Sequence, residues 1–264
     1  MPEMDLGDVT IHYDEAGSGA AAYVFCHGLG GSGEGFRDDM PFWAQHFRVL
    51  NWDNRGLGRS SAAAKYSVPL YASDLARLMD QLGIERALVH GVSWGGVLVQ
   101  QFALDYPEKC AGLVIDSSSS EVNAAASENW YQRGEVVRLG EKARLDVFQP
   151  AFAGHSASAE QVQAAGPRVK PEHVESYVAQ ARGVAGLREH PFTPRLAQIT
   201  CPVLVVGGGQ DATAGAAGSV ILARNLPNAE LQIFPDAGHG IYRQKQEEFR
   251  TLVLDFARRH GLIT

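Results

Sequence analysis

The sequence lacks the features that mark membrane, secreted and nucleic-acid-binding chains. No apolar run approaches the roughly 18 residues that a membrane-spanning helix needs, so no such helix is expected. The start of the chain, Met1 to Asp5, has neither the basic segment nor the apolar stretch of a signal peptide. Lys and Arg form no cluster and the net charge is −7, so we expect neither a nucleic-acid nor a membrane partner.

Cysteine is also scarce. The three cysteines, Cys26, Cys110 and Cys201, are widely spaced and lie in apolar runs. That spacing excludes a disulfide framework and a metal-ligand cluster, and it indicates buried thiols in a reducing compartment. We therefore expect a cytoplasmic protein without a metal or other cofactor. With 45% hydrophobic and 20% charged residues, the 264-residue chain is typical of one large domain or of a domain with an insertion.

Most of the chain alternates between strand-like and helix-like segments. Strands are predicted at residues 9–13, 21–26, 47–52, 86–90, 112–116, 202–206 and 229–234. Helices are predicted between them at residues 70–82, 97–104, 216–225 and 246–260. Strands separated by helices indicate an α/β fold with a mostly parallel, doubly wound sheet.

The middle of the chain departs from this alternation. Residues 121–194 contain no convincing strand, are rich in Ala, Glu, Gln and Arg, and show their best helical patterns at 127–139 and 171–185. We therefore expect a helical cap at 121–194, inserted between two parts of one core at 1–120 and 195–264.

Gly91-Val92-Ser93-Trp94-Gly95 fits the pattern G-x-S-x-G between a predicted strand and a predicted helix. A chain that passes directly from strand to helix bends sharply at Ser93, and small neighbours such as Gly91 and Gly95 relieve the crowding. A serine hydroxyl is a weak nucleophile until a base, an orienting acid and an oxyanion site act on it. Ser93 is therefore a candidate nucleophile that requires partners.

Suitable partners follow later in the chain. Asp211 and His239 each lie in a glycine-containing loop after a predicted strand, at the sheet edge where open α/β sheets bind ligands. The order Ser93, Asp211, His239 is the order expected when such a motif is a hydrolytic triad. Asp116 also ends a strand and remains the alternative acid. His27 to Gly33 and the N–H of Trp94 are the candidate oxyanion elements, with Leu29 as the second donor.

At these residues the chain resembles the α/β-hydrolases that carry a helical cap. His27-Gly28 resembles the oxyanion motif, Asp53 to Ser60 the D-x-R-G-x-G-x-S loop, and Gly91 to Gly96 the nucleophile elbow. The segments around Asp211 and His239 resemble the acid and histidine loops. Within the family the chain is most similar to esterases, enol-lactonases and cofactor-free haloperoxidases. One departure is that Ala212 to Gly215 contain no Pro, where relatives often carry one.

The resemblance implies a serine hydrolase of a carboxylic ester or lactone, with a small to medium, largely apolar substrate. Trp94, Trp130, Val136 and Phe152 are the candidate substrate-binding residues, and Arg133, Arg138 or Arg144 is a candidate for binding a substrate carboxylate. Asp53 and Arg55 are expected to form a structural ion-pair and hydrogen-bond network. The alternatives are a hydrolase of carbon–carbon bonds in meta-cleavage diketones, a perhydrolase and a non-catalytic receptor of a small ligand. The sequence predicts no oligomeric state.

Overall fold

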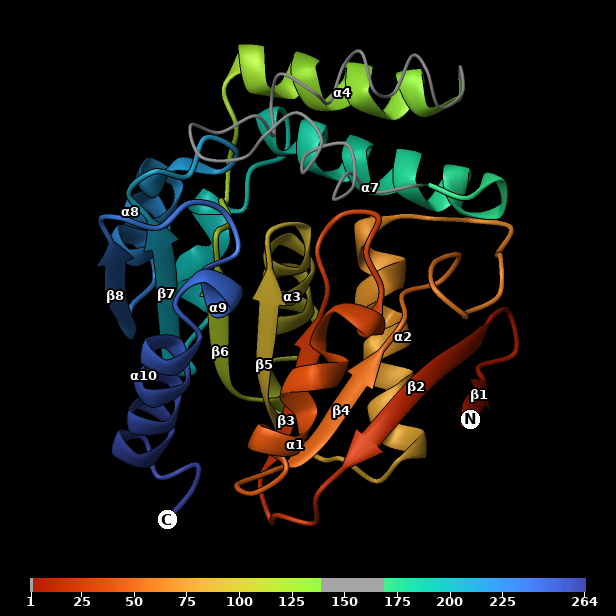
Figure 1. The fold of residues 1–264 in the computed structure, drawn as a ribbon. Coiled ribbons are helices and arrows are strands. Elements are labelled where there is room, and N and C mark those ends of the chain that lie inside the picture. Colours follow the sequence, from red (N-terminus) through yellow and green to blue (C-terminus); the bar gives the residue numbers. More distant parts are fainter. Residues whose placement is uncertain (1, 139–168) are drawn as a thin grey trace.

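The computed structural model describes residues 2–138 and 169–264, which build a layered α/β structure (Figure 1). Within the described residues the strands form one eight-stranded sheet in the order β1-β2-β4-β3-β5-β6-β7-β8. Their bounds are β1 Glu3–Asp5, β2 Thr10–Ala16, β3 Ala22–Cys26, β4 Arg48–Trp52, β5 Ala87–Val92, β6 Cys110–Asp116, β7 Val203–Gly208 and β8 Ala229–Phe234.

The sheet is mostly parallel, as predicted. Only β1–β2 and β2–β4 pair in antiparallel fashion among the described strands, and all pairs from β4 to β8 are parallel. The carboxyl ends of β3, β5, β6, β7 and β8 therefore meet at one edge of the sheet, where ligands bind in open α/β folds. The predicted strands all exist, whereas β1 was not predicted because three residues, Glu-Met-Asp, carry no apolar run.

Helices cover both faces of this sheet. The described α-helices are α1 Met40–Trp43, α2 Val68–Gln81, α3 Trp94–Asp105, α4 Ala124–Arg138, α7 Val174–Ala185, α8 Gly215–Asn225, α9 Ile241–Gln244 and α10 Gln246–Arg259. Side chains of α2, α3 and α8 pack into one apolar cluster, and side chains of α1 and α10 pack into a second cluster on the opposite face.

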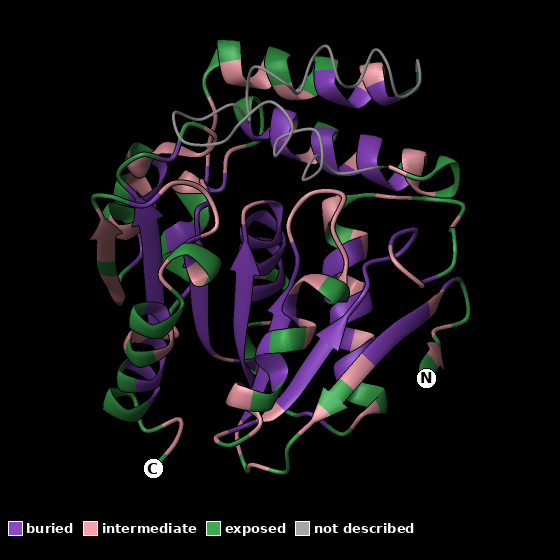
Figure 2. Ribbon diagram, viewed as in Figure 1, coloured by how far each residue is buried: buried purple, intermediate pink, exposed green. Residues whose placement is uncertain are grey.

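The central strands are buried on both sides (Figure 2). In β5, Leu88 points into one cluster and Val89 into the other, since successive side chains of a strand alternate between faces. Burial on both faces explains why these strands read as continuous apolar runs. Packing on both faces holds the sheet in place, and the loops described below follow the carboxyl ends of its strands.

Helices α4 and α7 pack against each other and lie above the carboxyl ends of the strands (Figure 1). No strand occurs in the described residues of the segment 121–194, in agreement with the helical expectation. The contact between α7 and the core includes Ser176, whose hydroxyl donates to the Arg55 carbonyl oxygen at 2.7 Å. The division into a core and a cap at residues 121–194 stays a prediction.

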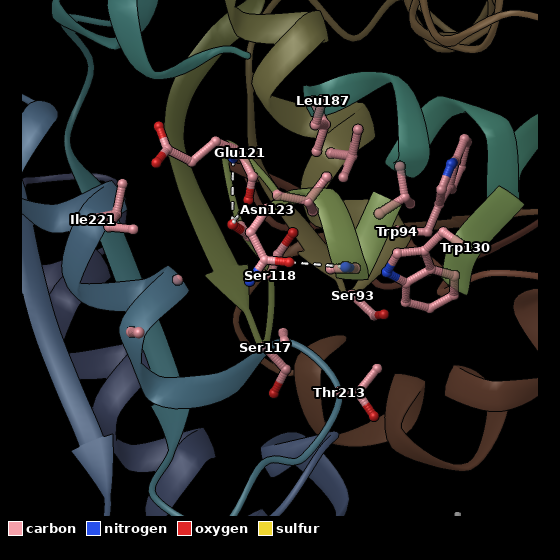
Figure 3. Close-up of a pocket in the computed structure, with 18 of the residues that line it drawn as sticks. Ser93, Trp94, Ser117, Ser118, Glu121, Asn123, Trp130, Leu187, Thr213 and Ile221 are labelled. Atoms are coloured by element: carbon pink, nitrogen blue, oxygen red, sulfur yellow. Dashed lines mark hydrogen bonds between the residues drawn. The ribbon is translucent and has the colours of Figure 1, made fainter. Parts of the chain in front are cut away.

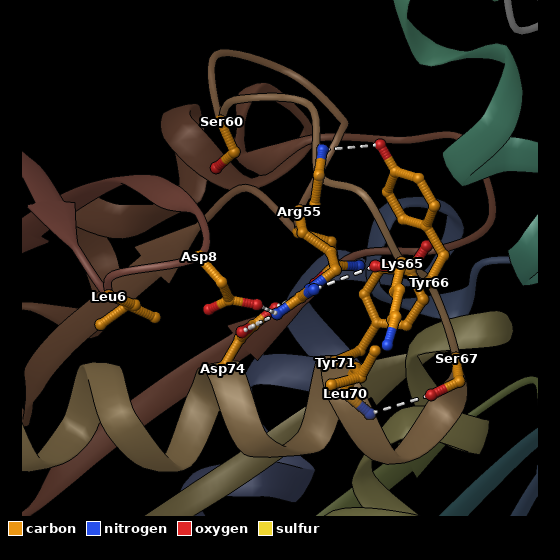
Figure 4. Close-up of polar contacts among 12 residues, drawn as sticks. Leu6, Asp8, Arg55, Ser60, Lys65, Tyr66, Ser67, Leu70, Tyr71 and Asp74 are labelled. Carbon is orange, nitrogen blue, oxygen red and sulfur yellow. Dashed lines mark hydrogen bonds and ion pairs between the residues drawn. The ribbon is translucent and has the colours of Figure 1, made fainter.

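Arg55 and Asp53 belong to two separate networks instead of the single one expected. The buried Arg55 guanidinium donates to both carboxylate oxygens of Asp74, at 2.5 and 2.6 Å, and also pairs with Asp8 (Figure 4). The Asp53 carboxylate instead accepts from the backbone N–H groups of Gly33, at 2.6 Å, and Arg59, at 2.8 Å. Arg55 thus ties the loop after β4 to α2, while Asp53 ties it to the loop after β3.

The cysteines and the helices can also be compared with the expectations from the sequence. All three cysteines are free; Cys26 and Cys110 are buried, whereas Cys201 is half-buried. Across residues 2–138 and 169–264, no helix combines the length and the apolarity that crossing a membrane requires.

Candidate active site

Ser93 lies at the sharp turn between β5 and α3. Its φ is 56° and its ψ is −115°, a conformation that residues with a side chain rarely adopt. A Cβ added at Gly91 would collide with the Gly95 carbonyl oxygen, and one at Gly95 would collide with the Cys26 carbonyl oxygen. The glycines therefore permit the strained turn, and the turn holds Ser93 at the N-terminus of α3.

The structure brings Asp211 and His239 together. Oδ2 of Asp211 lies 2.9 Å from Nδ1 of His239, although 28 residues separate them. The other carboxylate oxygen accepts from the N–H groups of Thr213, at 2.7 Å, and Ala214, at 3.0 Å. A proline at either position would lack that N–H, so here the departure from the family pattern supplies donors to the acid.

The surroundings of Asp211 favour its charged form. Burial raises the pKa of the carboxyl, but the hydrogen bond and charge interaction with His239 and the two backbone donors outweigh burial, so the net pKa is lowered. A charged Asp211 accepts from Nδ1–H of His239, and this leaves Nε2 as the basic nitrogen.

Asp116, the alternative acid, has other partners. Its carboxylate accepts from the Ser117 hydroxyl at 2.7 Å and from the Tyr242 N–H at 3.3 Å. Its main-chain oxygen accepts from the Ser93 N–H at 2.8 Å. Burial raises the pKa of Asp116 to about 6. Asp116 thus contacts the backbone on both sides of the site, while Asp211 holds the imidazole.

The loop after β3 is fixed by several hydrogen bonds. Nδ1 of His27 donates to the Gly28 carbonyl at 2.9 Å, and Nε2 accepts from the Asn54 N–H at 3.1 Å. These two bonds require a neutral ring, in agreement with the pKa of His27, which burial lowers despite opposing contributions from Gly28 and Asp53. Farther along, the Gly30 N–H donates to Oε1 of Gln180 on α7 at 2.9 Å.

The assignment of Trp94 and Leu29 as oxyanion donors stays a prediction, and the structure gives the surroundings of both residues. Trp94 is the first residue of α3, where helical N–H groups have no partner within the helix. Leu29 lines a cavity together with Ser93 and His239. The Ser93 hydroxyl makes no hydrogen bond to His239 in the described structure; such bonds are often long in ligand-free sites and tighten around a substrate.

Two cavities open from Ser93, and we name them by their position relative to His239. The histidine-side cavity, about 660 Å³, is lined by His27, Leu29, Arg133, Tyr177 and His239 among others. The far-side cavity, about 450 Å³, is lined by Trp94, Ser117, Ser118, Leu187 and Ile221 among others (Figure 3). Ser93, Trp130 and Thr213 line both cavities, so a molecule bound at Ser93 has space on either side.

The candidate substrate-binding residues divide accordingly. Trp94 lines the far-side cavity, and Trp130 lines both. Val136 lines neither; the neighbouring Val137 packs against Tyr177 and Ala181, and a step of about 100° along α4 turns Val136 away from that face. Phe152 lies outside the described residues.

The three candidate arginines also differ. Arg133 is buried, lines the histidine-side cavity and stacks on Trp130 at 4.8 Å. Arg138 pairs with Glu175 at 2.9 Å and lines neither cavity. Arg144 lies outside the described residues. Arg133 is thus the candidate that the geometry retains.

Several residues at this site carry no signal in the sequence. Ser118 was only part of a serine run, and Gln180 was one of many polar residues in a predicted helix. Gln180 contacts a residue 150 positions away, a relation for which the local sequence holds no signal. The positive φ of Ser117, 54°, was equally hidden, because the residue is not a glycine.

Known proteins similar to this chain are hydrolases of the α/β fold. A family profile described as the alpha/beta hydrolase fold matches residues 23–246. The "Putative carbamate hydrolase RutD" of Caulobacter sp. (strain K31) is 31% identical over 96% of this chain and 98% of its own length. The 2-hydroxy-6-oxo-6-phenylhexa-2,4-dienoate hydrolase of Comamonas testosteroni is 29% identical over 98% and 94%.

A solved structure extends the comparison. The enol-lactonase from Burkholderia xenovorans LB400 superposes with a TM-score of 0.86 at 25% identity, covering 97% of this chain and all of that one. The expected fold and the expected kinship with enol-lactonases are thereby confirmed. With its elbow, its sheet and a profile match over most of its length, the chain belongs to the α/β-hydrolase family.

Proposed function

We propose that the protein is a serine hydrolase that cleaves a carboxylic ester or lactone through an acyl-enzyme on Ser93. The observation that carries the proposal is the arrangement of three side chains around one cavity. Ser93 and His239 line it, and the Asp211 carboxylate lies 2.9 Å from the far nitrogen of that histidine. A nucleophile, a base and an orienting acid in this order are sufficient for acyl transfer.

Each group has a defined task in the proposed reaction. His239 takes the proton from the Ser93 hydroxyl as the oxygen attacks the substrate carbonyl, and Asp211 stabilises the resulting imidazolium. The N–H groups of Leu29 and Trp94 donate to the oxyanion, a contribution of about 10²–10³ in rate for each donor of this kind. His239 then gives the proton to the leaving oxygen, and water deacylates Ser93 by the same route.

Hydrolysis of a carbon–carbon bond is the second candidate, and one observation favours it. The buried Arg133 lines the same cavity as His239, where it is placed to bind a carboxylate of the substrate. The Comamonas testosteroni relative, by its name, acts on an acid with a long unsaturated chain.

Replacing Ser93 with Ala tests the proposal. We expect hydrolysis of p-nitrophenyl esters to fall to the background rate while the melting temperature changes little, and we expect an organophosphonate to label the wild type once per chain and the variant not at all. A panel of esters, lactones and meta-cleavage diketones then separates the two candidate reactions. Wild-type protein that neither hydrolyses any of them nor reacts with the phosphonate would indicate a ligand receptor instead.

A further inference from the structure

Two cysteines that are far apart in the sequence come together at the end of the sheet opposite Ser93. Cys110 is the first residue of β6, and Cys201 lies just before β7. The Leu113 N–H donates to the Pro202 carbonyl oxygen at 2.9 Å, so the amino ends of these two parallel strands lie side by side. Helices α4 and α7 lie above the carboxyl ends, at the other end of the strands (Figure 1). The two cysteines are therefore separated from the proposed catalytic residues by the length of the strands.

Both cysteines line one cavity of about 250 Å³. A water molecule needs roughly 10–15 Å³ of such space, so an oxidant as small as hydrogen peroxide fits beside the thiols. Both thiols are free, but Cys110 is only 1% exposed whereas Cys201 is half-buried. A reagent that enters the cavity from solvent therefore reaches Cys201 more easily than Cys110.

The two thiols differ in acidity as well as in exposure. The hydrogen bond between them lowers the pKa of Cys201 and raises that of Cys110. Burial opposes the lowered pKa of Cys201, while the positive charge of Arg86 supports it. The Arg86 guanidinium lines the cavity and donates to the Cys110 carbonyl oxygen at 2.9 Å. The Cys110 sulfur also lies 3.7 Å from the Tyr106 carbonyl oxygen, an acceptor that favours a protonated thiol. Cys201 is thus the thiol that ionises first.

These features distinguish a redox-sensing cysteine from a structural one. Such a cysteine has a lowered pKa, contact with solvent and a second thiol beside it, because the thiolate is the reactive form and the second thiol traps its oxidised product. Cys201 has all three features. Cys26, by contrast, is fully buried, does not line this cavity, and burial raises its pKa to about 12.

We propose that Cys201 is a peroxide-reactive thiol and that Cys110 converts its oxidised form into a reversible disulfide. The oxidant is hydrogen peroxide or an organic hydroperoxide from solution. The Cys201 thiolate attacks the terminal peroxide oxygen, the O–O bond breaks, and the departing oxygen takes up a proton to leave as water or an alcohol. The Cys110 sulfur then attacks the sulfenic acid on Cys201, and the hydroxyl group leaves as water with the Cys110 proton. The two thiols together lose two electrons, and the peroxide gains them.

The disulfide joins the start of β6 to the segment before β7 and closes a loop over residues 111–200, which include α4 and α7. A cross-link that closes a long loop restricts the unfolded chain, so oxidation should stabilise the folded protein. The bond forms at the amino ends of the strands, away from Ser93 and His239. This chemistry is therefore independent of the proposed function.

Mass spectrometry of the native protein tests the proposal. After treatment with a small excess of hydrogen peroxide, we expect the wild type to lose the mass of two hydrogen atoms, to show a cross-link between Cys110 and Cys201 in the peptide map, and to regain its mass with dithiothreitol. Cys110→Ser should stop at the sulfenic acid, which dimedone labels on Cys201. Cys201→Ser should give neither product. Wild-type protein that forms no such cross-link, or a Cys201→Ser variant in which dimedone labels Cys110, overturns the proposal.

Cys26→Ser is the matched control and should form the same cross-link as the wild type. Arg86→Gln tests the electrostatic contribution to the reactivity of Cys201. Iodoacetamide should alkylate Cys201 several-fold more slowly in this variant at about pH 7, and the pH profile of alkylation should shift upward, because the neighbouring positive charge is gone. An unchanged profile would remove Arg86 from the proposal.

Urea unfolding measures the effect of the cross-link on stability. The midpoint for the wild type should rise by about 1 M or more on oxidation, while peroxide should leave the midpoint of Cys110→Ser unchanged. Equal midpoints for the oxidised and reduced wild type would contradict the stabilising effect of the disulfide.

Discussion

Two buried carboxylates of the site, Asp116 and Asp211, make different contacts. Asp116 was the alternative acid, yet it contacts the Ser93 N–H through its main chain and the Ser117 hydroxyl and Tyr242 N–H through its carboxylate. It thereby joins the nucleophile turn to the segment that follows His239. Asp211, by contrast, contacts the imidazole itself. The two carboxylates divide the tasks of holding the loops and holding the base.

The burial of Asp116 makes the free energy of unfolding depend on pH. Burial raises the pKa of Asp116 from 3.8 to about 6 in the folded protein. Because the unfolded chain loses this proton at lower pH, ionising the buried group costs folding free energy as the pH rises from about 4 to 6, by roughly 3 kcal/mol in total. The stability that the protonated Asp116 carboxyl contributes is therefore fully present below its pKa in the unfolded chain and is lost above its pKa in the folded protein.

Asp116→Asn should remove this dependence. The free energy of unfolding of the variant, measured in urea, should rise relative to that of the wild type by roughly 3 kcal/mol between about pH 4 and pH 7. Asp255→Asn, at an exposed position, is the control and should show a constant difference. A constant difference for Asp116→Asn as well would mean that the carboxyl titrates normally in the folded protein.

At the scale of the elements, the central strands and long helices can be predicted because the apolar residues of each recur with a clear period. The residues at which helices begin are harder to predict. Helix α3 begins at Trp94 instead of residue 97, since Gly95 and Gly96 disfavour a helix locally but are required by close packing. Helix α2 begins at Val68, where the Ser67 hydroxyl accepts from the Leu70 N–H. Contacts between distant elements, such as α7 with the loop after β3, leave no local pattern.

The contact between Gln180 and Gly30 predicts that α7 influences catalysis. Gln180→Leu leaves the Gly30 N–H without its acceptor and removes one of the hydrogen bonds that hold the loop carrying Leu29. In the proposed mechanism Leu29 donates to the oxyanion, and such a donor acts mainly in the transition state. We therefore expect kcat for an ester to fall by about tenfold or more, with KM changed much less. Gln180→Glu keeps an acceptor oxygen and should recover most of kcat per phosphonate-labelled site. A change confined to KM would assign Gln180 to substrate binding alone.

At the scale of the whole molecule, the ion pairs of Arg55 lie apart from the residues proposed for catalysis. The pair formed by Arg55 and Asp74 is almost fully buried and joins the loop after β4 to α2, and neither residue lines the two cavities. The sequence predicts a structural network for Arg55 but not its partner Asp74, because Asp74 lies in a helix 19 residues later with no motif to mark it.

Arg55→Met should therefore affect folding and leave the chemistry intact. Breaking this buried pair leaves the Asp74 carboxylate with Arg77 alone, at 2.6 Å. We therefore expect the free energy of unfolding to decrease by less than the roughly 3–5 kcal/mol that a fully uncompensated buried charge costs, while kcat per labelled site stays within a few-fold of the wild type. Arg258→Met, which breaks an exposed pair with Asp255, should cost less than about 1 kcal/mol. Equal losses in the two variants would refute a special role for the buried pair.

Through the hydrogen bond from Gly30 to Gln180, the docking of α7 and the binding of an anion near Ser93 should be thermodynamically linked. If the docked position of α7 favours the conformation of the loop that binds an oxyanion, then any anion that occupies the oxyanion site must favour the docked position of α7 by the same factor. Transition-state mimics such as phosphonates should consequently protect the α7 amides from hydrogen exchange. Helix α7 would then report, from outside the sheet, on the charge that forms at Ser93.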